Sequence, residues 1–314
     1  IRDVYKRQTP AILDDALHLT GGARYTRDKK SGDLFKVNGV DKDFRFDISS
    51  SRIDPTVTLA FDATDNIHLY GKWGTAYRAG GANSRSVTYR AYKPEEVETS
   101  EIGFKGEFLD HHVRLNLAAY KTIYKNQQID FNAVLSEVPG GPTRTTIETV
   151  NVDGHGTIKG FEADLVVMLV EGLTLTAAYA YTKGDLAQAA NPFAGNALQT
   201  VFVVYTPKNA FSGAIDYSLP LDWATLRAHV DANGGDGYHS QSSDAALTDS
   251  SFLVNARLSL ADITLKGDAK LQISAWSRNL FNEQHTFFQT GSSSLQLGIF
   301  NEPRTYGLEA TVRF

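Results

Sequence analysis

The chain ends in Thr305-Tyr306-Gly307-Leu308-Glu309-Ala310-Thr311-Val312-Arg313-Phe314, a segment in which apolar and polar residues alternate. One face of this segment carries Tyr306, Leu308, Ala310, Val312 and Phe314. The opposite face carries Thr305, Gly307, Glu309, Thr311 and Arg313. Alternation with a period of two is typical of a β-strand that has one apolar face and one polar face.

The same alternation recurs along the whole chain of 314 residues. It predicts about twelve strands, near 17–28, 52–62, 66–78, 98–109, 112–124, 156–169, 172–183, 208–219, 222–233, 251–261, 268–279 and 304–314. Many of these segments are much longer than the roughly five or six residues usual in globular proteins. No helical periodicity interrupts them, so the sequence predicts an all-β, antiparallel fold.

The connections between these segments alternate between short and long. Short turns are expected at 62–66, 109–112, 170–172, 219–221 and 262–267. Long polar loops are expected near 29–51, 79–97, 125–155, 184–207, 234–250 and 280–303. This alternation is typical of an up-and-down transmembrane β-barrel, in which short turns face the periplasm and long loops face the outside. The C-terminus is then expected on the periplasmic side of an outer membrane.

Composition and charge agree with a barrel. The net charge is -5 and the chain has no Cys, which disfavours a nucleic-acid binder and excludes disulfides and cysteine-bound metals. Charged residues such as Lys72, Glu101 and Arg257 fall on the strand face opposite the apolar residues, because charge on a lipid-facing surface is costly. Aromatic residues near strand ends, among them Tyr70, Trp73 and Tyr120, are expected in girdles at the membrane interfaces.

The domain prediction separates a short N-terminal stretch from the barrel. Residues 1–16 are expected outside it, and residues 1–8 match no strand and are treated as non-native. Residues 17–314 are expected to form a partial barrel. The chain has no initiating Met and no signal peptide, so we expect a fragment of a longer protein.

Candidate ligand-binding residues lie in or beside the long loops, where arginines and aromatic rings can pair with or stack on a ligand. They are Arg78, Arg85, Tyr89, Arg90, Tyr92, Tyr238 and His239. The eight histidines show no metal-binding spacing, and no nucleophile motif is present. No catalytic residue and no metal site are predicted.

Several segments resemble the C-terminal part of the barrel of TonB-dependent outer-membrane receptors. They are 69–81, which ends in Tyr77-Arg78-Ala79-Gly80-Gly81, the Pro94–Gly106 segment with its repeated glutamates, Gly160-Phe161-Glu162-Ala163, Arg278-Asn279-Leu280-Phe281-Asn282, and the closing strand 303–314. Their order over about 50–314 makes the combination more specific than any one motif.

The resemblance implies that the chain is part of a 22-stranded barrel whose plug domain and TonB box are absent here. It further implies the barrel wall and ligand-capturing loops of a receptor that imports a scarce nutrient such as a ferric siderophore. The transported small molecule can carry iron, but no resident cofactor is implied. The implied partners are outer-membrane lipid, the TonB complex through the missing plug, and the barrel-assembly machinery, for which Phe314 is the signal.

Three alternatives remain open from the residues themselves. A passive outer-membrane porin shares the alternation and the girdles. An outer-membrane barrel hydrolase would need Ser240 and His239 for activity. A soluble β-sandwich would expose its polar faces to water. The resemblance favours a receptor over all three and implies that the chain is not an enzyme.

Overall fold

The chain forms one long curved sheet in the computed structural model, which describes residues 2–8, 11–12, 16–37, 40–86, 89–136, 141, 143–265, 267–292 and 295–314. All twelve strands expected from the sequence are present. They are β3 (Leu17–Val37), β4 (Val40–Thr64), β5 (Ile67–Arg78), β8 (Glu95–Phe108), β9 (Val113–Lys125), β12 (His155–Val170), β13 (Leu173–Asp185), β16 (Asn209–Pro220), β17 (Thr225–Gly235), β18 (Ser251–Thr264), β19 (Lys270–Arg278) and β22 (Thr305–Arg313).

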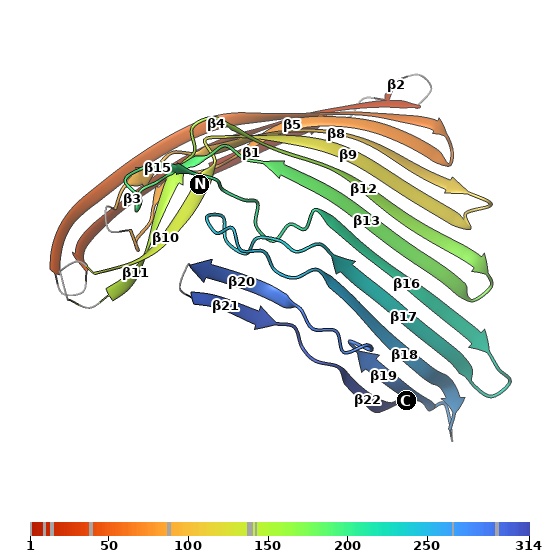
Figure 1. Cartoon of the computed structure of the whole chain (residues 1–314). Coiled ribbons are helices and arrows are strands. Elements are labelled where there is room, and N and C mark those ends of the chain that lie inside the picture. Colours follow the sequence, from red (N-terminus) through yellow and green to blue (C-terminus); the bar gives the residue numbers. More distant parts are fainter. Residues whose placement is uncertain are drawn as a thin grey trace.

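The sheet is an antiparallel meander. Its strands follow the order β1-β3-β4-β5-β8-β9-β12-β13-β16-β17-β18-β19-β22, and two short strands, β1 (Arg2–Gln8) and β2 (Ala11–Ile12), both pair with β3. Figure 1 shows the resulting curved wall. Among the described residues no pairing joins β1 to β22, so the wall stays open at both edges. None of these residues forms a helix long and apolar enough to cross a membrane.

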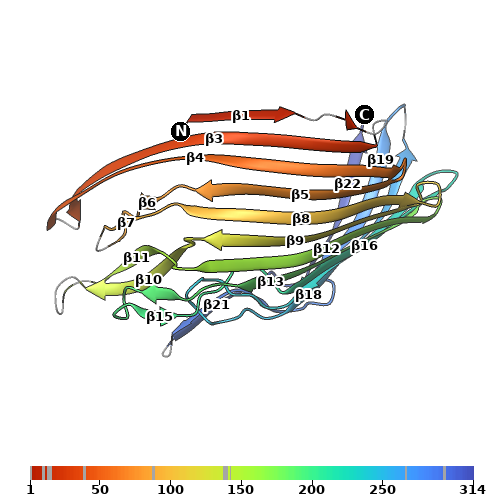
Figure 2. The same ribbon diagram turned by 90° about the horizontal axis from the view of Figure 1, so that it is seen from above.

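The long connections gather at one end of the wall and contain four small hairpins. These pair β6 (Gly81–Ala82) with β7 (Ala91–Tyr92), β10 (Gln128–Ser136) with β11 (Thr143–Asn151), β14 (Ala189–Asn191) with β15 (Ala197–Gln199), and β20 (Thr286–Ser292) with β21 (Leu295–Phe300). Figures 1 and 2 show these hairpins at one end of the strands and the short turns at the other. From β4 onward the short and long connections alternate as expected.

Two expectations about the N-terminal third were wrong. The segment 29–51 is not a loop, because β3 and β4 continue through it as one hairpin, with Lys29 opposite Ser49 and Asp33 opposite Arg45. Phe44, Phe46 and Ile48 alternate with charged residues, but the facing stretch 29–33 has no apolar residue, and this hid the hairpin. Cross-strand contacts such as the Arg45–Asp33 ion pair at 3.2 Å help to hold it. Residues 2–8 and 11–12, expected outside the barrel, extend the sheet as β1 and β2.

The wall has almost no buried core of its own, because its apolar side chains lie exposed on one face. The exposed rows on this face include Leu59, Leu69, Ile102, Phe161, Leu165, Phe211, Ile215, Leu258, Ile273 and Leu308. The opposite face carries ion pairs between strands, such as His229–Asp216 at 2.7 Å between the neighbours β17 and β16, and Arg257–Glu309 at 2.8 Å, which reaches across β19 from β18 to β22. A sheet with one dry face and one charged face matches the wall of a transmembrane barrel around a wet interior.

Three aromatic side chains on the charged face each lie over a glycine of the next strand. Tyr70 is paired with Gly103, Tyr120 with Gly160, and Trp276 with Gly307. A Cβ at any of these glycines would come closer than 3.0 Å to the facing ring. Tyr70 and Tyr120 were expected in the lipid-facing girdles, and this was wrong, because glycine leaves room for a ring to lie flat along the inner wall.

Replacing Gly103 with valine is expected to lower the free energy of unfolding by about 2 kcal/mol, because the Tyr70 ring must leave its place. The displaced Tyr70 would also lose the hydrogen bond of 2.8 Å that it donates to Glu101. Urea unfolding of the protein in detergent measures the change. Gly71→Val is the matched control, since a Cβ at Gly71 meets nothing within 4 Å. In the Tyr70→Ala background, Gly103→Val should cause little further destabilisation, because the ring that it displaces is absent. If the double variant loses the sum of the two single losses, the steric explanation is contradicted.

The glutamates of the 94–106 segment each hold a neighbouring element. Glu95 is buried and accepts hydrogen bonds from Arg78 and from the backbone of Gln128. Glu98 accepts from the indole of Trp73 at 3.1 Å, and Glu101 accepts from Tyr70. This spacing of carboxylates therefore has a structural use, which is to join β8 to β5 and to the loops above it.

Candidate functional site

The long connections form a layer of their own over one end of the wall, with a small apolar core. Five buried residues make this core, namely Ile129, Phe131, Val152, Ala189 and Val201. They come from hairpin β10–β11, the residue that follows it, and the connection between β13 and β16. These loops therefore pack as a folded unit, and their side chains have defined positions.

Arg78 lies where β5 ends and the loop layer begins. Its guanidinium pairs with Glu95 at 3.1 Å and donates to the backbone carbonyl of Gln128 at 3.3 Å. The Glu95 carboxylate also accepts from the Gln128 backbone N–H at 2.7 Å. Arg78 remains exposed, but its charge already serves to join β5, β8 and β10.

Residues 85 and 86 pack against hairpin β10–β11, and Tyr89 lies beside them in the loop. The Ser86 hydroxyl donates to Glu148, and the Arg85 carbonyl accepts from the Thr146 hydroxyl at 2.7 Å. Tyr89 is only 4% exposed, has a positive φ of 53° and packs against the ring of Phe44. The side chains of Arg85 and Arg90 remain exposed, and that of Tyr92 is half-buried.

Tyr238 and His239 are half-buried within the connection between β17 and β18. The Tyr238 hydroxyl donates to the carbonyl of Phe287 at 2.7 Å. The His239 ring stacks on Phe202 with 3.8 Å between ring centroids, and its Nδ1 is buried with no hydrogen-bond partner in the described part of the chain. Both side chains thus contribute to loop packing.

The seven predicted ligand-binding residues fall into two groups, which come from the connection after β5 and from the connection after β17. Arg85 and Ser86 contact β11 at Thr146 and Glu148, and Arg78 contacts Gln128 of β10. The connection that holds Tyr238 and His239 reaches β10 through the Ser242 hydroxyl, which donates to the Asp130 carbonyl at 3.3 Å. The structure does not gather all seven around one pocket, and their role in binding stays a prediction.

A polar cavity of about 450 Å³ lies on the β10 side of this hairpin. Its walls come from β10, β11, the connection 236–250 and hairpin β20–β21. The lining residues are Asn132, Ala133, Val134, Thr145, Gln241, Ser243, Asp244, Ala245, Thr290, Gly291 and Leu297. Sequence reasoning missed this cavity, because its walls come from three connections that are distant in the chain and carry no shared motif.

Asp244 holds two walls of the cavity together. Burial opposes ionisation of its carboxyl group, but the N–H groups of Ala246 and Gly291 and the hydroxyl of Thr290 donate to it at 2.9, 2.7 and 2.8 Å. These hydrogen bonds outweigh burial and hold the pKa of Asp244 below its ordinary value of 3.8.

The contact made by Asp244 is therefore expected to persist at neutral and mildly acidic pH and to fail in strong acid. A lowered folded-state pKa contributes stability above the unfolded pKa, and this contribution is lost below about pH 4. The hydrogen-exchange protection factor of the Gly291 amide should stay constant from neutral pH down to about pH 4 and fall below it. Asp244→Asn should weaken protection at every pH and abolish the acid transition, whereas Asp41→Asn should leave it unchanged. An acid transition that survives in Asp244→Asn would contradict this.

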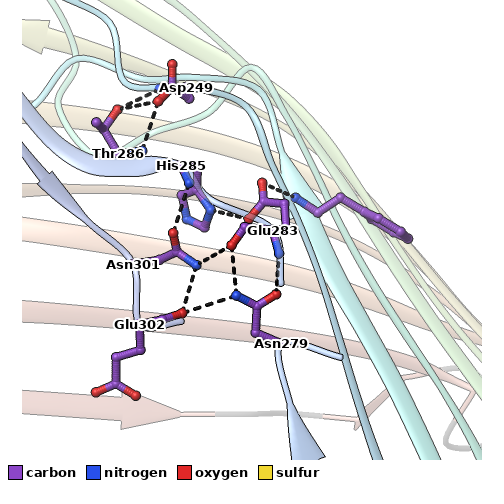
Figure 3. Close-up of polar contacts among 8 residues, drawn as sticks. Asp249, Asn279, Glu283, His285, Thr286, Asn301 and Glu302 are labelled. Carbon is purple, nitrogen blue, oxygen red and sulfur yellow. Dashed lines mark hydrogen bonds and ion pairs between the residues drawn. The ribbon is translucent and has the colours of Figure 1, made fainter. Parts of the chain in front are cut away.

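A second polar network fixes the base of hairpin β20–β21, as Figure 3 shows. The Asn279 amide donates to the carbonyls of Glu283 and Glu302 at 2.8 and 3.1 Å and accepts from the Glu283 N–H at 2.8 Å. The Asn301 amide donates to the same two carbonyls and accepts from the His285 N–H. Asp249 accepts from the N–H and hydroxyl of Thr286, each at 2.9 Å.

The arrangement does not support hydrolysis. The Ser240 hydroxyl accepts from the Gln289 backbone N–H at 2.9 Å, while the His239 ring lies against Phe202. Within the described ranges, no group of three or more His, Cys, Asp or Glu side chains is placed to hold a metal ion.

Comparison with known proteins agrees with this architecture. The family model described as "TonB dependent receptor-like, beta-barrel" matches residues 9–301. The chain belongs to the TonB-dependent receptor β-barrel family. Members are receptors and transporters of the outer membrane of Gram-negative bacteria and not enzymes, so this barrel is an outer-membrane protein.

Relatives of this TonB-dependent receptor barrel include two ferric-pyoverdine receptors. The ferric-pyoverdine 358 receptor of Pseudomonas putida is 22% identical over 93% of this chain and 33% of its own length. The ferric-pyoverdine M114 receptor PbuA of Pseudomonas sp. (strain M114) is 26% identical over 71% of this chain and 26% of its own length. The chain thus spans a third or less of these relatives.

Solved structures show the same fold. The ferric yersiniabactin uptake receptor FyuA from Yersinia pestis superposes with a TM-score of 0.78 at 16% identity, over 99% of this chain and 45% of FyuA. The ferric preacinetobactin receptor BauA from Acinetobacter baumannii superposes with a TM-score of 0.69 at 18% identity, over 99% of this chain and 42% of BauA. The receptor barrel described here corresponds to less than half of either chain.

Proposed function

We propose that the chain is the barrel wall and ligand-capturing loop layer of a receptor for TonB-dependent uptake of a ferric siderophore. The observation that supports this most strongly is the family match over residues 9–301. Relatives named for a ligand include receptors for ferric pyoverdine and for metal-pseudopaline. The geometry agrees, because the loops are packed into a folded layer with a polar cavity at one end of the wall.

The loop layer would meet the ligand first. Arg85 and Arg90 extend exposed cations from the residues beside β11, and the cavity offers amide and hydroxyl groups beside β10. Tyr92, Tyr238 and His239 remain candidates at the edges of these loops, and Arg78 reaches the surface beside them. Tyr89, buried against Phe44, would hold the loop in place and not touch the ligand.

The proposal also assigns the partners. The exposed apolar face would lie against outer-membrane lipid. Residues 270–278 and 305–313 pair so that Lys270 is opposite Arg313, beside the short turn at 265–269. This register supports a C-terminus on the periplasmic side, where Phe314 would serve the barrel-assembly machinery. The TonB complex would act through a plug that is not part of this chain.

Uptake of radioactive iron tests the proposal. The whole coding sequence is expressed in an iron-starved host that lacks its own siderophore receptors, and ferric pyoverdines and ferric yersiniabactin are supplied in turn. We expect uptake of a ferric siderophore that stops when tonB is deleted. Passive entry of small solutes without TonB would favour a porin, and folded receptor in the membrane with no ferric siderophore uptake would overturn the proposal.

A pair of loop variants locates the binding surface. Arg85→Ala with Arg90→Ala is expected to weaken ligand binding about tenfold, equivalent to about 1.4 kcal/mol. Arg45→Ala is the control, because Arg45 is an exposed cation on the β3–β4 hairpin that pairs with Asp33. Equal losses in both variants would show that the effect is general electrostatics and not contact at residues 85–90.

A further inference from the structure

Three lysines form a row across adjacent strands of the wall. Lys159 on β12 is the direct cross-strand partner of Lys121 on β9 and of Lys183 on β13. All three side chains are exposed, and none takes part in an ion pair among the described residues. Like charges placed directly opposite each other destabilise a sheet. The row therefore favours an anion that lies across all three ammonium groups.

The lysine row lies on the lipid-facing side of the wall. Toward the short turns, the next residues on the same face are Ala119, Phe161 and Tyr181, which are also direct cross-strand partners. Toward the loops, the next row is Ile123, Thr157 and Asp185, so one carboxylate lies beside the row on its loop side. Lys121 lies near the loop end of β9, eight residues after Val113 at its start. Since a membrane-crossing strand needs about 9–11 residues, the row is placed at the headgroup level of the outer leaflet. It is an exception to the sorting of charges onto the inner face.

An apolar groove begins beside this row and provides a second, independent feature. The groove measures about 550 Å³. It is lined in part by Lys121, Val57, Leu59, Trp73, Ile102 and Ala119. It stays open because Gly71 has no side chain, and a Cβ there would meet nothing within 4 Å. A neighbouring groove of about 370 Å³ shares Ile102 and Ala119 and continues to Phe161.

We propose that Lys121, Lys159 and Lys183 bind the phosphates of an outer-leaflet lipid with two phosphate groups, and that one of its acyl chains lies in the groove at Gly71. The row covers two interstrand spacings, about 9–10 Å, which is wider than one phosphate and suits a headgroup with two. The low dielectric of the bilayer surface strengthens these charge-assisted contacts. The site does not depend on the proposed uptake function.

Native mass spectrometry of the delipidated receptor, expressed from its whole coding sequence, tests this site. The probe is lipid A with two phosphates, compared with its monophosphorylated and dephosphorylated forms. We expect the diphosphorylated form to bind and the dephosphorylated form to bind at least tenfold more weakly. The variant Lys121→Gln, Lys159→Gln, Lys183→Gln should lose binding by a similar factor. The variant Lys29→Gln, Lys36→Gln, Lys42→Gln removes the same charge from the β3–β4 hairpin and should bind normally.

Gly71→Leu tests the groove separately, because it fills the acyl-chain position and leaves every lysine in place. We expect a loss of binding of several-fold. If the triple lysine variant fails to reach the membrane, Lys159→Gln alone removes the central charge and should weaken binding several-fold. Unchanged binding in the lysine variants, equal binding of the dephosphorylated form, or displacement of the lipid by millimolar inorganic phosphate would overturn the proposal.

Discussion

Replacing Gly172 with alanine is expected to lower the free energy of unfolding of the receptor by about 3 kcal/mol. Gly172 occupies the short turn between β12 and β13 with a positive φ of 79°. A residue with a side chain pays about 1–2 kcal/mol in this left-handed conformation. The new Cβ would also lie closer than 3.0 Å to the backbone oxygen of Ser218, and relieving such a clash costs about 1–3 kcal/mol.

The clash cannot be relieved by a rotamer change, because the obstacle is backbone. The Ser218 N–H donates to the Gly172 carbonyl at 2.8 Å, so the turn and β16 hold each other in place. Urea unfolding in detergent gives the free energy, and gel mobility without boiling gives the folded fraction in membranes.

Gly195→Ala is the matched control for Gly172→Ala. Gly195 also has a positive φ, 63°, but a Cβ there meets nothing within 4 Å. Gly195→Ala should therefore lower the free energy of unfolding only by the cost of the left-handed backbone conformation, about 1 kcal/mol. Equal losses at the two positions would show that the contact with Ser218 has no energetic weight.

The strands of the wall could be predicted from the sequence because a lipid-facing surface and a wet interior sort residues strictly. Ile102, Phe104 and Phe108 alternate with polar residues, and all twelve strands predicted in this way are present. The alternation of short and long connections was likewise evident, since it depends only on spacing. Where a stretch has no apolar residue, as in residues 29–33, this signal is lost, and the extension of β3 and β4 into a hairpin was missed.

The arrangement of the loop layer could not be predicted, because it depends on contacts between residues far apart in the chain. Ser86 meets Glu148, and Asp244 meets Gly291, without any local pattern that announces the pairing. The burial of Tyr89 follows from such contacts as well. The lysine row requires the register of three strands, since Lys121, Lys159 and Lys183 are unremarkable singly.

Replacing Asn279 with alanine is expected to lower the free energy of unfolding by about 3 kcal/mol, since it removes three hydrogen bonds and leaves a buried donor without a partner. Asn279 is 5% exposed and has a positive φ of 49°. The carbonyls of Glu283 and Glu302 keep the Asn301 amide as a donor, but the Glu283 N–H has only the Asn279 oxygen as acceptor among the described residues. Urea unfolding in detergent measures the loss.

Asn282→Ala separates this network from backbone strain. Asn282 also has a positive φ, 55°, but is exposed, and its side chain accepts one hydrogen bond, from the Arg304 N–H at 3.0 Å. Asn282→Ala should lower the free energy of unfolding by about 1 kcal/mol, the value of one hydrogen bond. The Asn279 amide bonds backbone groups on both sides of hairpin β20–β21, so Asn279→Ala should also increase hydrogen exchange in that hairpin. Hairpin β10–β11 has its own apolar core and should stay protected. Equal exchange in both hairpins, or equal destabilisation by the two variants, would contradict the role of Asn279 in anchoring β20–β21.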